Sequence, residues 1–187
     1  MSQLNYAQQA NAFAGMMADL TQGYVKDTYV QGEASAEIAF GKFIVMKTGM
    51  TSGDPALGAG IPAIGVLPAA STDDFKGGGF VIHSHDYDKR LELGTTGLKP
   101  KTLMSVLRRG RIWVNAATAM AVTDLIYVHY AAGVTNAGAV AGDVANTSDA
   151  AKNTQLFGAR VVTPIAAAGL CEIEVDMLAH AASSAAH

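Results

Sequence analysis

Short runs of β-branched, aromatic and other apolar residues recur along most of this chain, separated by Gly, Pro, Asn, Asp and Ser. Runs bounded in this way are typical of β-strands. We expect strands in the segments Tyr24–Val30, Ile38–Lys47, Ile61–Leu67, Phe80–Ile82, Thr102–Leu107, Arg111–Asn115, Leu125–Tyr130, Leu156–Val162 and Leu170–Met177. Helical periodicity is confined to the first 20 residues. The sequence therefore predicts an all-β fold, an antiparallel barrel or sandwich of about eight short strands.

Residues 1–22 predict an extended N-terminal arm with at most a short helix, because Gly15 and many Asn and Gln residues interrupt its helical spacing. A frayed terminus needs no large apolar side chains, and we expect the arm to be anchored on another protein surface by Leu4, Tyr6, Phe13, Met16 and Met17. Residues 23–178 form the predicted β domain, with a long, mobile Ala/Gly-rich loop at 132–154. Residues 179–187 form a predicted flexible C-terminal tail.

The segment SVLRRGRIWV, residues 105–114, places three of the chain's 13 basic residues around Gly110. Glycine adopts positive φ without steric cost, so the segment predicts a hairpin turn or a bulge. An exposed turn would present Arg108, Arg109 and Arg111 together. These arginines could contact phosphates, pair with carboxylates of a protein partner, or keep a strand edge soluble. Because arginine recognises carboxylates in bidentate fashion and the chain has no wider basic field, we favour a protein interface.

Charge and composition argue against several classes of partner. The formal net charge is −3, whereas nucleic-acid-binding surfaces usually carry a basic excess, so we expect no nucleic-acid partner. No apolar run approaches the ~18 residues that span a bilayer, and no basic amphipathic helix is indicated, so we expect no membrane association. The first residues lack the features of a signal peptide, and the single cysteine, Cys171, is expected to be a small buried hydrophobe. These features fit synthesis in the cytoplasm.

His83, His85 and Asp86 form the strongest candidate for a chemical site. Alternate residues of an extended segment share a face, so His83 and His85 could both bind a metal. No cysteine pair, HExxH motif or GxSxG motif supports catalysis, and the glycines at 77–79 lack the residues and helix of a phosphate-binding loop. We therefore expect no catalytic residue, metal or cofactor. A metal-dependent enzyme or a sugar-binding domain that uses these three residues is the alternative.

Five segments occur in a fixed order between the N-terminus and residue 114. They are Leu4–Tyr6, Phe13–Met16, Glu33–Gly41, Gly65–Pro68 and Ser105–Val114. Together they resemble the structural cement family of tailed phages, whose members decorate and stabilise capsids, and SVLRRGRIWV is the closest match. The resemblance extends over roughly residues 1–130, and the loop at 132–154 and the C-terminal tail have no counterpart in it.

The resemblance implies a mainly β, non-enzymatic virion protein that self-associates as a dimer or trimer. It also implies binding to the outer surface of the capsid, where such proteins bridge neighbouring major capsid subunits. On this hypothesis the apolar arm and the three arginines contact the capsid. A structural protein of the tail or of another particle component is a further alternative.

Overall fold

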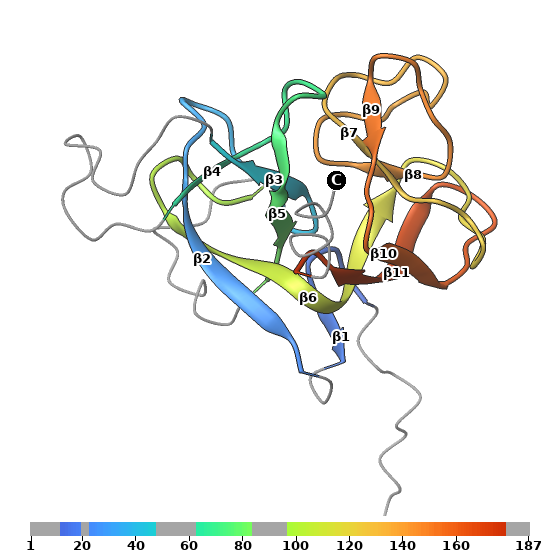
Figure 1. Cartoon of the computed structure of the whole chain (residues 1–187), viewed down its shortest axis with the longest axis horizontal. Helices are drawn as coiled ribbons and strands as arrows, with labels where there is room; N and C mark the ends of the chain where they lie inside the picture. The colour runs from blue at the N-terminus through green and yellow to red at the C-terminus, as the bar shows by residue number, and fades with distance from the viewer. Residues whose placement is uncertain (1–11, 20–22, 48–62, 84–96, 179–187) are drawn as a thin grey trace, which may run out of the picture.

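The computed structural model describes residues 12–19, 23–47, 63–83 and 97–178 (Figure 1). These residues contain no helix, which confirms the predicted all-β class. The strands are β1 (Met17–Asp19), β2 (Val25–Gln31), β3 (Phe43–Met46), β4 (Ile64–Val66), β5 (Asp74–Val81), β6 (Leu103–Ala116), β7 (Tyr127–His129), β8 (Val144–Ala145), β9 (Asn153–Gln155), β10 (Ala159–Thr163) and β11 (Gly169–Asp176). No helix in this part of the chain is long and apolar enough to cross a membrane.

Five strands close into a small barrel, in the order β2-β4-β3-β5-β6 and back to β2. All its pairings are antiparallel except β2 with β4. Its buried apolar residues, called here the barrel core, are Tyr29, Ile38, Ile44, Val81, Leu98, Met104 and Val106. A Cβ atom on Gly65 would overlap the side chains of Ile44 and Met104. Strand β4 therefore lies so close to these two side chains that a larger residue at position 65 would require their ends to move.

A second set of strands is built on the C-terminal half of β6, which pairs with β11 and β8. Strand β10 pairs with the other edge of β11, and β7 lies between β8 and β9. The two sets lie side by side, with β6 running through both (Figure 1). The outer core between them includes Phe43, Phe80, Leu107, Ile112, Val114, Val128, Ile173 and Val175. Because alternate residues of a strand face opposite sides, Ile44 points into the barrel core while Phe43 points into the outer core. Strand β3 and the second half of β5 are thus buried on both faces.

The predicted hairpin at Gly110 is wrong, because residues 103–116 form one long strand, β6. The predicted bulge is present: Val25 pairs with Arg109 and Lys26 with Leu107, so Arg108 is the extra residue. Leu107 and Ile112 both enter the outer core although five positions separate them, and a regular strand returns to one face only at even separations. Gly110, with a φ of 131°, lies between them where the strand bends.

Two segments differ locally from their prediction. The described end of the predicted arm is part of the sheet, because a turn at residues 14–15 leads into β1, which pairs with β6. The segment 132–154, predicted as one long loop, contains β8 and the first residues of β9. Residues 1–11 and 179–187, which hold the rest of the arm and the predicted tail, lie outside the described residues.

Candidate protein-interaction site

The pairing register of β6, β11 and β10 places basic and acidic side chains directly opposite one another. Arg109 pairs in register with Asp176, and Arg111 with Glu174, across β6 and β11. Arg160 faces the same Glu174 from β10. The three arginines and two carboxylates, called here the charge ladder, thus share one face of three adjacent strands because residues at alternate positions point the same way.

The ion pairs of the charge ladder differ in length and exposure. Arg109 Nε lies 3.5 Å from Asp176 Oδ2, and Arg111 Nε lies 3.4 Å from Glu174 Oε2, whereas Arg160 Nη2 donates to the same oxygen at 2.7 Å. The Arg109 side chain is 56 % exposed. Exposed ion pairs of this kind contribute about 0–1 kcal/mol, so little free energy opposes the exchange of one carboxylate for another.

Glu174 is shared by two guanidinium groups. The hydrogen bonds from Arg160, together with the charges of Arg160 and Arg111, hold the pKa of Glu174 below its ordinary value of 4.5, against a smaller opposing effect of burial. Glu172 lies on the same face of β11 as Glu174 and Asp176, so three guanidinium groups and three carboxylates share this face and their formal charges cancel near neutral pH. The long pairs of Arg109 and Arg111 leave these two guanidinium groups able to engage a carboxylate of a partner surface.

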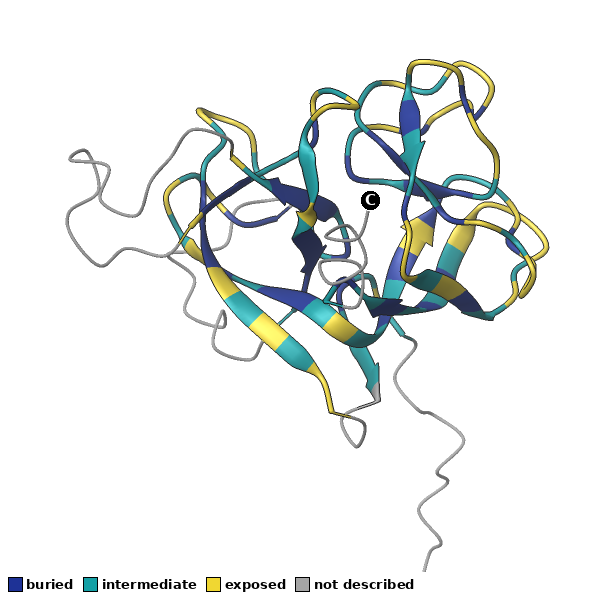
Figure 2. Cartoon of the chain, in the orientation of Figure 1, coloured by how far each residue is buried: buried dark blue, intermediate teal, exposed yellow. Residues whose placement is uncertain are grey.

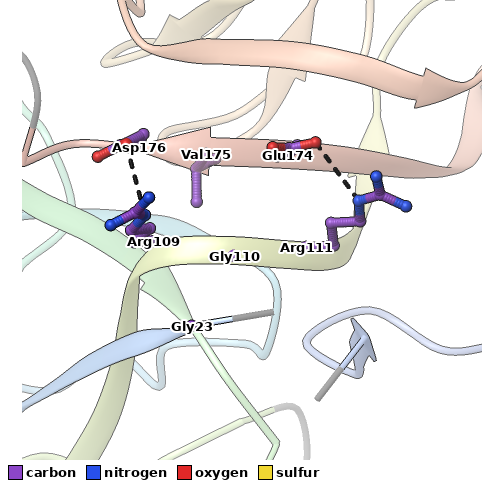
Figure 3. A pocket seen from close by; sticks show the side chains of 7 residues that line it. All are labelled: Gly23, Arg109, Gly110, Arg111, Glu174, Val175 and Asp176. Atoms are coloured by element: carbon purple, nitrogen blue, oxygen red, sulfur yellow. Dashed lines mark hydrogen bonds and ion pairs between the residues drawn. The ribbon is translucent and has the colours of Figure 1, made fainter. Parts of the chain in front are cut away.

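A small hollow lies between the bend of β6 and β11 (Figure 3). Gly23, Gly110 and Val175 line it together with the ladder residues Arg109, Arg111, Glu174 and Asp176. Its volume of about 140 Å³ is well below the ~300 Å³ at which small-molecule pockets begin. The arginines at its rim therefore suit contact with a protein surface better than enclosure of a small ligand.

Arg108 lies apart from the charge ladder, although it is adjacent in sequence. Its guanidinium pairs with Asp27 of β2 at 3.1 Å and donates to the backbone carbonyl of Lys76 at 2.8 Å. The bulge turns Arg108 toward the barrel, so the three predicted arginines do not form one exposed group. Sequence reasoning missed the acidic partners and Arg160, although the alternating acids of CEIEVD, residues 171–176, were the available signal.

The predicted arm residues that the structure describes pack on the chain's own β domain. Gly15 donates to the carbonyl of Trp113 at 2.7 Å, and its own carbonyl accepts from the backbone of His83 at 2.8 Å. Cβ atoms on Gly15 and Gly41 would meet the opposing backbone and side chains within 2.6–3.2 Å, so the two segments cross where neither carries a side chain. Met17 packs against the outer core.

Phe13 is 44 % exposed and its ring meets the edge of His83 at 5.0 Å. Met16 is half-buried beside β6. Leu4 and Tyr6 lie outside the described residues. Residues 13–17 thus cross β6 and pack on the sheet of their own chain.

The alternative metal site is represented in the described residues by His83 alone, since His85 and Asp86 lie outside them. The His83 ring is packed edge-on against both Phe13 and Phe40, whose ring centres are 5.0 and 4.6 Å away. Within the described ranges, no group of three His, Cys, Asp or Glu side chains is placed to hold a metal ion. The packing of His83 is that of an aromatic cluster.

A buried polar cluster, which sequence reasoning missed, organises the segment predicted as a loop. His129 Nε2 lies 3.1 Å from Asn136 Nδ2 and 3.3 Å from Asn153 Nδ2. Both amides also donate to the Thr147 carbonyl, which fixes their orientation toward the His129 ring. Asp149 Oδ2 accepts three backbone N–H groups at residues 134–136. The cluster is enclosed and joins separate turns, so it acts as a structural link.

Comparison with known proteins adds to this geometry. The family model described as structural cement protein (E217 gp24/Pam3 gp6) matches residues 2–176. A chain in the solved capsid of Myoviridae phage XM1 is 16 % identical, with a TM-score of 0.60 over 94 % of this chain and 98 % of that chain. That likeness shows the shared fold. No curated protein matches the chain.

The family match places this all-β chain in the class of structural proteins of a phage particle. Since the family model covers nearly the whole chain, this protein belongs to the phage structural cement family, and its place is with the capsid proteins of the virion.

Proposed function

We propose that this protein binds the outer surface of a phage capsid and stabilises it, without enzymatic activity, by bridging neighbouring major capsid subunits. The match of the cement-protein family over residues 2–176 is the observation that carries this proposal. A capsid repeats each contact many times, so modest contacts at every copy add up to a large resistance to subunit separation. The protein is made in the host cytoplasm and joins the assembled particle.

The charge ladder is the proposed polar part of the capsid contact. Arg109 and Arg111 keep long ion pairs and partly exposed guanidinium groups, which a capsid carboxylate can engage at small cost. Arg108 is assigned a supporting part, since Asp27 and the Lys76 carbonyl already hold it. Its contribution is to fix the bulge that orients the other two arginines.

The arm is the proposed apolar part of the contact. Phe13, Met16 and Met17 secure its base on the β domain, and Phe13 leaves part of its ring exposed. Leu4 and Tyr6 are the proposed contacts with a neighbouring capsid subunit, because the eight and six positions that separate them from Ala12 could span roughly 26 and 20 Å in an extended chain. Ordering such a segment on binding offsets part of the contact energy.

Substitutions within the arm test this proposal. Leu4→Asp with Tyr6→Asp places two charges where apolar contact is proposed, and cement-free heads incubated with this variant should show much lower occupancy by cryo-electron microscopy. The matched control, Gln3→Asp with Gln8→Asp, adds the same charge without removing apolar side chains. Equal occupancy for both double variants would refute the arm contact.

Removal of residues 2–11 is a coarser test. This deletion spares Met17 and the Gly15 crossing, which belong to the β domain. The shortened protein should fold but decorate heads poorly. Full occupancy by the shortened protein would show that the arm is dispensable. If the full-length protein does not bind cement-free heads, the proposal of capsid binding itself is refuted.

A further inference from the structure

Strand β9 lies at an edge of the sheet, because β7 is the one strand with which it pairs among the described residues. Leu156 donates to the carbonyl of Ile126, so this pair is hydrogen-bonded and the adjacent pair, Gln155 with Tyr127, is not. The backbone N–H and C=O of Gln155 therefore point away from β7, and in the described part of the chain they have no partner. An edge of this kind can pair with an extended segment of another chain.

A groove opens beside this edge. It is lined by Thr154 and Gln155 of β9 and by residues 72–76 at the start of β5. Strand β5 belongs to the barrel and β9 to the second set of strands, so the groove lies between the two sets (Figure 1). Strand β9 is buried at Asn153 and half-buried at Thr154 and Gln155 (Figure 2). The groove has a volume of about 440 Å³, which lies within the range of ligand-binding pockets, roughly 300–1,000 Å³.

The apolar residues that line the groove are continuous with the outer core. Phe75 packs against that core, and its ring is stacked on Phe43 with the ring centres 5.8 Å apart. Leu156 is buried in the core, whereas Phe157, at the turn after β9, is 57 % exposed. A partner that covers Phe75 and Phe157 therefore gains apolar contact on a surface that the fold already holds in place.

We propose that this groove binds an extended segment of the major capsid protein, which adds to β9 as a further strand and places an apolar side chain against Phe75 and Phe157. The backbone of the segment exchanges hydrogen bonds with Gln155, and its alternate side chains enter the groove. The free backbone groups of Gln155 favour a peptide over a small molecule of the same volume. The identity of the partner rests on the proposed function, whereas strand addition follows from the geometry of β9.

Two other occupants are less suited to the groove. Residues 179–187 of this chain are all Ala, Ser or His, so they include no β-branched or aromatic residue of the kinds that favour strands, and no large apolar side chain. A second copy that paired through β9 would have a strand of only three residues on each side of the contact. A protein that bridges two subunits also needs two contact surfaces, and the groove and the charge ladder lie on different strands.

The test compares Gln155→Pro with Gln155→Ala in the full chain, by occupancy on cement-free heads over a range of protein concentrations. Proline removes the outward N–H of residue 155, and it removes no hydrogen bond of the fold because this N–H does not pair with β7. Alanine keeps the N–H and is the matched control. We expect the concentration at half occupancy to rise about 10-fold in Gln155→Pro and to change little in Gln155→Ala.

Phe157→Asp is an independent test, because it places a charge where the apolar side chain of the partner is proposed to lie. Its matched control is Leu103→Asp, since Leu103 has a similar exposure of 51 % and lies at the start of β6, outside the groove. Phe157→Asp should lower occupancy and Leu103→Asp should not. Thermal unfolding midpoints of all four variants ensure that occupancy is compared between folded proteins.

The proposal is overturned, with capsid binding intact, if Gln155→Pro and Phe157→Asp both decorate heads as the unmodified protein does. It is also overturned if the unmodified protein is a dimer that Gln155→Pro dissociates, because the edge then binds a second copy. Hydrogen exchange of the free protein tests the remaining occupant: protection of the Gln155 amide that is lost on removal of residues 179–187 would assign the groove to them. An unmodified protein that does not decorate heads refutes the proposed function and with it the partner named here.

Discussion

Gly110 is a position where a single methyl group should have a cost that comes almost entirely from the backbone conformation. Its φ of 131° lies in a region that side chains other than glycine rarely adopt, and a residue forced there costs about 1–3 kcal/mol. A Cβ atom at this position would also meet Tyr24 Cβ at 3.2 Å. Tyr24 is 41 % exposed and can yield, so the backbone term dominates. Gly110→Ala should therefore destabilise the protein by about 2 kcal/mol.

That loss corresponds to a fall of roughly 4–8 °C in the midpoint of thermal unfolding, for a chain of this size. Differential scanning calorimetry of Gly110→Ala and Gly23→Ala provides the measurement. Gly23 lines the same hollow, has no atom within 4 Å of an added Cβ and is not among the positive-φ glycines, so its substitution should be neutral or slightly stabilising. Equal midpoints for the two variants would refute the argument that positive φ at Gly110 makes the bend.

Two further predictions concern titratable groups. Burial alone would raise the pKa of Asp149, but three backbone N–H donors and the nearby His129 hold it below its ordinary value of 3.8. The stability that this carboxylate contributes is therefore complete above pH 3.8 and is lost as the pH falls through the lower pKa of the folded state. The free energy of unfolding in urea should thus change less between about pH 5 and about pH 3 in Asp149→Asn than in the unmodified protein. Burial, assisted by Glu172, raises the pKa of the Cys171 thiol to about 11. The native protein should not react with a thiol reagent at neutral pH, while the unfolded protein should react fully; rapid labelling of the native protein would contradict the buried position.

The fold class was predictable because it depends on local pattern. Leu125–Tyr130 alternates as a strand should, and β7 lies within it. The Arg-rich segment shows the limit of this reasoning, because a glycine between two apolar runs fits either a hairpin or a bent strand. The outcome depends on β2 and β11, which pair with opposite halves of β6 and come from distant parts of the chain.

The candidate site was predictable only in part, for the same reason. Arg109 and Arg111 were identifiable from their spacing, but their partners Asp176 and Glu174 lie more than 60 positions away in sequence. The segment 132–154 was predicted as a loop because Gly, Ala and Asn dominate it. Its order comes from side chains that bond back to the backbone, around His129 and Asp149, and such bonds leave no periodic pattern.

A single strand, β6, belongs to both the barrel and the second set of strands. Both the barrel and the second set of strands need β6 to complete their hydrogen bonding. We therefore expect the two sets to fold and unfold together. A pulling force on the barrel is transmitted to the second set of strands along the backbone of β6. The hydrogen bonds of β6 with β2 and β11 then resist this force together. If the protein bridges capsid subunits as proposed, this shared strand would connect its two sets of strands without a flexible joint.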